Sequence, residues 1–132
     1  MKILVLGAGA REHAIVKALV RTGTNADHIV VAPGNAGIAN DVTCDASLNM
    51  MDPAAVTEYV KNKGFELVII GPEAPLIEGV ADPLRAAGID VFGPSRVAAG
   101  LEGSKAFAKR LRTCNFKTGQ FPRLRVKITR SF

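Results

Sequence analysis

Two glycines near the start of this chain have the spacing of a phosphate-binding turn. Gly7 and Gly9 end a short apolar run and precede Arg11, where apolar residues begin to recur at helical spacing. Glycines let backbone amides approach an anion, and the free N–H groups and dipole of a helix N-terminus favour phosphate. The same residues can also serve only as a tight strand-to-helix turn. The segment therefore predicts either a phosphate site or a structural turn.

The residues that follow do not complete a dinucleotide-binding fingerprint. That fingerprint needs a third glycine and an acidic residue at the end of the second strand. This chain has Glu12 at the third glycine position and Ala32-Pro33-Gly34 at the expected strand end. The pattern disfavours an NAD-dependent oxidoreductase and favours phosphate-ester or nucleotide-like ligands. We interpret Glu12 as a solvated residue of the first helical turn, and His13 as a packed or capping histidine.

Three further glycine- and proline-rich loops follow apolar runs, at residues 33–37, 71–76 and 93–95. In an open parallel sheet, ligands bind beyond the carboxyl ends of the strands, so we expect these loops to line one edge. Glu73 lies between two prolines. It is interpreted either as an acceptor for a ribose hydroxyl or an amine, or as a surface acid without a ligand.

The elements that must position these loops alternate along the chain. Apolar runs predict strands over residues 2–6, 28–32, 66–70 and 90–92. Apolar periodicity and capping residues predict helices over 11–22, 53–63, 77–87, 96–101 and 105–111. Such alternation predicts an α/β fold, a doubly wound parallel sheet covered by helices on both faces.

Composition places the chain in a reducing compartment. Its 132 residues, 48% of them hydrophobic, suffice for one core. Cys44 and Cys114 have neither metal-ligand nor disulfide spacing, and no targeting or transmembrane segment is evident. We therefore expect a cytoplasmic protein without a metal site of its own and without a membrane partner.

The basic charge is confined to one end of the chain. All 12 acidic residues lie at or before Glu102, whereas eight of the 17 basic residues fall between Lys109 and Arg130. A nucleic-acid-binding arm is one reading of this tail, but only three phenylalanines there can stack on bases, which disfavours it. The alternating segment 123–129 also offers a route to self-association.

Four motifs in order resemble phosphoribosylamine-glycine ligase. They are residues 7–14 (GAGAREHA), 33–37 (PGNAG), 71–76 (GPEAPL), and 92–94 (FGP) together with 101–105 (LEGSK). The resemblance covers residues 1 to about 111. It implies a Rossmann-like pre-ATP-grasp substrate-cleft domain over residues 1–103 and the start of an ATP-grasp domain over 104–112. The basic tail over 113–132 departs from the family pattern.

The resemblance implies an ATP-dependent carbon-nitrogen ligase of purine biosynthesis. Such an enzyme joins glycine to 5-phosphoribosylamine through a glycyl phosphate, with magnesium assisting phosphoryl transfer. The main ATP and magnesium sites belong to domains that we expect to be missing, so we expect a truncated chain that is inactive alone. The alternative is a stand-alone module that binds a phosphosugar or a nucleotide without catalysis.

The resemblance also implies site residues, none of them catalytic or metal-binding. The residues expected to contact phosphoribosylamine are Gly9, Arg11, Asn35, Gly37, Glu73 and Pro75. Lys105 resembles the lysine that binds the ATP phosphates.

Overall fold

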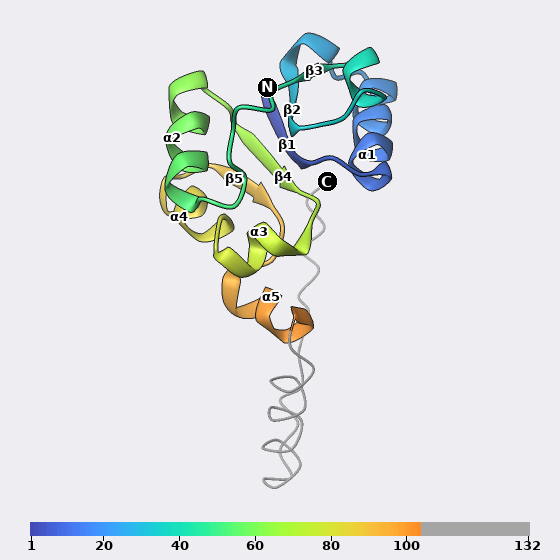
Figure 1. The fold of residues 1–132 in the computed structure, drawn as a ribbon. Coiled ribbons are helices and arrows are strands. Elements are labelled where there is room, and N and C mark those ends of the chain that lie inside the picture. The colour runs from blue at the N-terminus through green and yellow to red at the C-terminus, as the bar shows by residue number, and fades with distance from the viewer. Residues whose placement is uncertain (104–132) are drawn as a thin grey trace, which may run out of the picture.

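A five-stranded parallel sheet organises the protein in the computed structural model, which describes residues 1–103 (Figure 1). The strands are β1 (Ile3–Gly7), β2 (Ile29–Pro33), β3 (Thr43–Cys44), β4 (Leu67–Ile70) and β5 (Asp90–Phe92). Their order is β3-β2-β1-β4-β5, which confirms the predicted doubly wound α/β class. The chain runs outward from β1 to β3 and then returns to the other side of β1. The strand order therefore reverses between β1 and β4.

Four α-helices lie between these strands, and a fifth follows β5. They are α1 (Ala10–Arg21), α2 (Pro53–Lys63), α3 (Glu73–Glu78), α4 (Ala81–Ala86) and α5 (Arg96–Gly103). Two short 3-10 helices lie over Ala26–His28 and Ile38–Asn40. Asp52 is the N-cap of α2 and accepts hydrogen bonds from the amides of Ala54 and Ala55. Within residues 1–103, no helix has the length and apolar character needed to cross a bilayer.

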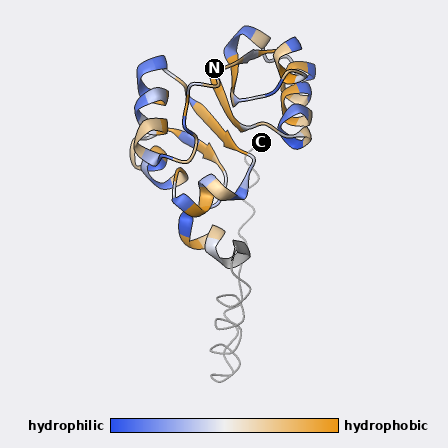
Figure 2. Ribbon diagram, in the orientation of Figure 1, coloured by the Kyte–Doolittle hydropathy of each residue, from blue (hydrophilic) through white to orange (hydrophobic). Residues whose placement is uncertain are grey.

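The core has one layer on each face of the sheet. Successive side chains of β1 enter opposite layers because a strand is pleated, and this explains why β1 is apolar throughout. Figure 2 shows apolar strands at the centre of the protein and hydrophilic residues on the outer helices. The layer beneath α2 and α4 includes Leu4, Leu6, Val68 and Ile70. The layer beneath α1 includes Ile3, Val5, Val16 and Ile69.

Two details differ from the predicted elements. The two-residue strand β3 pairs with β2 and was not predicted, because two residues are too few for a recognisable alternation. The single helix predicted over 77–87 is wrong: Gly79, with φ of +88°, separates α3 from α4. A left-handed glycine ends a helix readily, because it has no Cβ to clash. α3 also begins earlier than predicted, at Glu73, inside the segment predicted as a loop. In this shorter helix Ile77 is 38% exposed.

A carboxylate network joins the end of β3 to α2. Asp45 accepts hydrogen bonds from the Ser47 hydroxyl (2.5 Å), the Ser47 amide (3.0 Å) and the Tyr59 hydroxyl (2.6 Å). Lys63 Nζ lies 3.3 Å from the same carboxylate and 4.5 Å from the Tyr59 ring centroid. The hydrogen bonds from Ser47 and then Tyr59 hold the pKa of Asp45 far below its usual range. The charged form of Asp45 therefore stabilises the fold.

We expect Asp45→Asn to destabilise the protein at neutral pH and to have a progressively smaller effect in acid. Because the folded-state pKa of Asp45 is lowered, its stabilisation is fully present above the unfolded pKa of about 3.9 and is lost gradually as the pH falls from there through the folded-state pKa. Urea unfolding at about pH 6 and about pH 3 measures the difference. Glu58→Gln, at an exposed position of α2, is the control, and its difference in stability from wild type should be the same at both pH values. A gap between wild type and Asp45→Asn that is as large at about pH 3 as at about pH 6 contradicts the prediction.

Candidate ligand cleft

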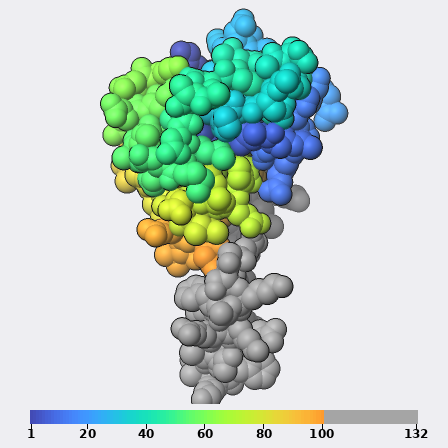
Figure 3. Space-filling view, viewed as in Figure 1, coloured from blue at the N-terminus to red at the C-terminus, as the bar shows by residue number. Residues whose placement is uncertain are grey.

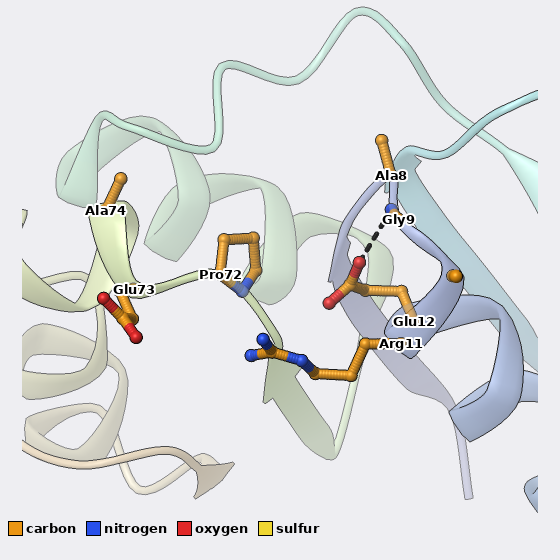
Figure 4. Close-up of a pocket in the computed structure, with 8 residues that line it drawn as sticks. Ala8, Gly9, Arg11, Glu12, Pro72, Glu73 and Ala74 are labelled. Atoms are coloured by element: carbon orange, nitrogen blue, oxygen red, sulfur yellow. Dashed lines mark hydrogen bonds between the residues drawn. The ribbon is translucent and has the colours of Figure 1, made fainter.

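A cleft of about 590 Å³ opens where β1 and β4 end side by side. Its lining comes from the turn after β1 and the turn after β4, residues 8–12 and 72–74 (Figure 4). In the space-filling view the surface of the early residues adjoins that of the segment containing α3 (Figure 3). The strand order reverses at this point, so the two connections diverge and leave a crevice between them.

Glu12 lies on the floor of this cleft and is buried, with 5% of its surface exposed. Its Oε2 accepts a hydrogen bond of 2.7 Å from the amide of Gly9, which closes the first turn of α1. Its side chain occupies the space left by the absent side chains of Gly7 and Gly71. The interpretation of Glu12 as a solvated residue is therefore wrong. Among the residues described, it is the one buried charged side chain.

The Gly9 amide was expected to be available to a bound anion, but it already donates to Glu12. The glycines of the first turn still have a steric purpose, because a Cβ on Gly7 or Gly9 would lie 2.6 Å or 2.9 Å from Glu12. The turn thus accommodates a carboxylate of the chain itself at the position where dinucleotide-binding folds accept a pyrophosphate.

Arg11 and Glu73 present opposite charges from the two walls of the cleft. Arg11 Nη1 donates a 3.0 Å hydrogen bond to the carbonyl of Gly71, so the guanidinium reaches across from α1 to the end of β4. Figure 4 shows it extending toward the wall that carries Pro72 and Glu73. Both charged side chains are exposed, and neither forms an ion pair with another residue of the described range. The cleft therefore offers a ligand several N–H donors and a carboxylate.

Asn35 connects the loop after β2 to the loop after β1. Its Nδ2 donates to the carbonyl of Ala8 (2.7 Å), and its Oδ1 accepts from the amide of Ile38 (2.9 Å). Beside it, the amide of Gly34 donates to the carbonyl of Gly7 (3.1 Å). These contacts fix the shape of the turn that leads into α1.

His13 forms part of a second connection between α1 and the segment after β2. Its Nε2 lies 2.6 Å from Asp41 Oδ2, and Lys17 Nζ lies 2.8 Å from Asp41 Oδ1. Hydrogen bonds from Lys17 and then His13 lower the pKa of Asp41. The half-buried His13 is packed, as predicted from the sequence, whereas its partner Asp41 was not identified.

The structure brings together half of the residues predicted to contact the ligand. Gly9, Arg11 and Glu73 line the cleft. Asn35 and Gly37 lie exposed on the neighbouring loop, and Pro75 is buried within α3. Lys105, the segment 104–112 and the tail 113–132 lie outside the described residues. Sequence reasoning missed Glu12 as a lining residue, although its place at the third glycine position was a signal.

The described residues include no group of three or more His, Cys, Asp or Glu side chains that could hold a metal ion together. The cleft has the composition of a site for a polar organic ligand, with a guanidinium and a carboxylate on opposite walls.

The fold and the cleft define a class of protein: doubly wound α/β domains with a ligand crevice at the reversal of strand order, here with a carboxylate in place of the third fingerprint glycine. Residues 1–102 match the family described as "Phosphoribosylglycinamide synthetase, N domain". The chain belongs to this family.

Similar proteins share the name phosphoribosylamine-glycine ligase. The relative from Leifsonia xyli subsp. xyli is 64% identical over 111 residues, which are 84% of this chain and 26% of that protein. The relative from Agrobacterium fabrum is 48% identical over 127 residues, 96% of this chain and 30% of that protein. The crystal structure from Thermotoga maritima matches with a TM-score of 0.62 and 28% identity, over 88% of this chain and 25% of that one. The chain thus spans about a quarter of the length of these relatives.

Proposed function

We propose that this chain is the substrate-cleft domain of a cytoplasmic ATP-dependent ligase that joins glycine to 5-phosphoribosylamine in purine biosynthesis. The observation that carries the proposal is the cleft between β1 and β4, because two of the family's motifs meet there. The reaction is supported by the names of relatives of which this chain matches 26% and 30%. A carboxylate is a poor acyl donor, and its phosphorylation by ATP would provide the leaving group that the amine displaces.

Within this cleft we assign roles to two side chains and to the backbone of one glycine. Arg11 is held at Gly71 through one N–H, which leaves further donors for hydroxyl or phosphate oxygens of phosphoribosylamine. Glu73, on the opposite wall, accepts from a ribose hydroxyl or from the amine. The backbone at Gly9 forms part of the cleft lining. Contacts from Asn35, Gly37 and Pro75 stay predictions for the ligand-bound state.

The proposed sites for ATP and magnesium lie beyond the described residues. Lys105 is proposed to contact the ATP phosphates, and magnesium is proposed to bind carboxylates of an ATP-grasp domain. The roles assigned above to the described residues concern substrate binding alone.

We expect the isolated 132-residue chain to release no ADP from ATP in the presence of glycine and phosphoribosylamine. A coupled assay on protein of confirmed mass measures this. Lys105→Ala provides the background rate. Turnover above that background would overturn the assignment of this chain as a domain that needs the rest of the enzyme.

A stand-alone binding module is the second candidate, favoured by a cleft whose lining lies entirely within residues 8–74. If the cleft binds without the other domains, isothermal titration with ribose 5-phosphate should detect it. We expect Arg11→Ala to weaken this binding about tenfold or more, because a charge-assisted hydrogen bond is lost. Arg21→Ala, at the far end of α1, is the matched control and should bind as wild type does. Absence of binding by wild type would exclude the stand-alone module and leave the ligase domain intact as a proposal.

A further inference from the structure

Glu12 occupies the position at the start of α1 where a phosphate would otherwise bind. Its Oε2 lies 2.7 Å from the Gly9 amide, which is the hydrogen-bonding distance of a bound anion. We propose that Glu12 is a specificity-determining residue: its carboxylate keeps phosphate groups away from the N-terminus of α1 and leaves that part of the cleft to hydroxyl or ammonium donors.

The position of this carboxylate is fixed by the residues around it. A Cβ on Gly71 would lie 1.9 Å from Glu12 Oε1, and a Cβ on Gly7 would lie 2.6 Å from Glu12 Cγ. Glu12 therefore fills a space that two glycines leave for it. Because the side chain is buried in this space, moving it aside for an arriving anion would break its bond to the Gly9 amide and empty the space between Gly7 and Gly71.

The second carboxylate oxygen of Glu12 favours ligand groups that donate a hydrogen bond. Oε1 has no hydrogen-bond partner among the described residues, and Glu12 belongs to the lining of the cleft. A phosphate beside this oxygen would place two negative charges together in a site partly shielded from water, which is unfavourable. A hydroxyl or an ammonium group can instead donate to Oε1.

The inference deepens the proposed function and rests on it in one respect, namely that the ligand is a phosphosugar with an amine. Under that assignment, the ribosylamine end faces α1 and the phosphate lies away from Gly9. The exclusion of phosphate itself can be tested without any sugar.

The test is a titration of the isotope-labelled 132-residue chain with inorganic phosphate, monitored at the backbone amides of residues 8–11 by NMR. We expect wild type to show no saturable shift at the Gly9 amide. Glu12→Ala should show saturating shifts there, at phosphate concentrations at least about tenfold lower than any wild-type response. Glu12→Gln removes the charge but keeps an oxygen that can accept from Gly9, so it should respond at phosphate concentrations between those of wild type and Glu12→Ala.

Saturation of the wild-type Gly9 amide by phosphate would overturn the inference whatever the variants do. A Glu12→Ala variant that is folded, as judged by amide dispersion, and does not respond would also overturn it. Should that variant not fold, Glu12→Gln decides the matter: a phosphate response no stronger than that of wild type would overturn the inference. Failure of the proposed function appears separately, as ADP release by the isolated chain above the Lys105→Ala background, and leaves the phosphate result unaffected.

Discussion

Replacing Gly71 by alanine is expected to lower the free energy of unfolding by about 3–5 kcal/mol, the largest effect that we predict for a single methyl group in this protein. The added Cβ would lie 1.9 Å from Glu12 Oε1 and 2.7 Å from Glu12 Cδ. The carboxylate would have to leave its buried position and give up its bond to the Gly9 amide. Urea unfolding followed by circular dichroism measures the loss.

The matched control is Gly100→Ala in α5, where a Cβ meets nothing within 4 Å. Because alanine is the better helix former, this change should be neutral or stabilising by up to about 1 kcal/mol. In the double variant Gly71→Ala with Glu12→Ala, the clash is absent, so its cost should be smaller than the sum of the single costs by about 1–3 kcal/mol. Additive costs would show that Glu12 is not what excludes a side chain at Gly71.

Replacing Gly34 by alanine is expected to lower the free energy of unfolding by about 2–4 kcal/mol. Two independent causes act at this position. The backbone has a φ of +71°, which is strained for any residue with a Cβ, and that Cβ would lie 2.3 Å from the Cys44 sulfur. Chemical denaturation of the variant against wild type gives the size of the effect.

Gly64 separates these two causes. It has nearly the same backbone conformation, with φ of +68°, but a Cβ there meets nothing within 4 Å. Gly64→Ala should therefore cost only the backbone strain, about 1 kcal/mol. Equal losses for Gly34→Ala and Gly64→Ala would mean that Cys44 adjusts without cost. Partial recovery in Gly34→Ala with Cys44→Ala would confirm the steric part.

The sheet could be predicted from sequence because its strands are continuous apolar runs that end in glycine or proline. β1, β2, β4 and β5 each carry that signal, and all four lie where it indicates. β3 carries no such signal, since it depends on pairing with β2 rather than on its own residues. The break at Gly79 had a local signal, a glycine within a helical pattern, but the apolar spacing on either side of it favoured one helix.

The cleft was predicted in outline for a reason of topology. Loops that follow parallel strands share one edge, so Gly9, Arg11 and Glu73 lie together as expected. The burial of Glu12 could not be foreseen, because the space for it depends on Gly71, a residue far along the chain. For Asn35, an amide suits both a ligand and a backbone carbonyl, and residue type alone does not distinguish these uses.

The central place of β1 has a consequence for the order in which the nascent chain can fold. β1 pairs with β2 early, but its other edge waits for β4, which ends at Ile70. Until that residue leaves the ribosome, a wholly apolar strand keeps one row of backbone donors and acceptors open, and such an edge readily pairs with another chain. Pairing of β1 with residues 67–70 closes this edge. Any stall before that point would leave the nascent domain at its most prone to aggregate.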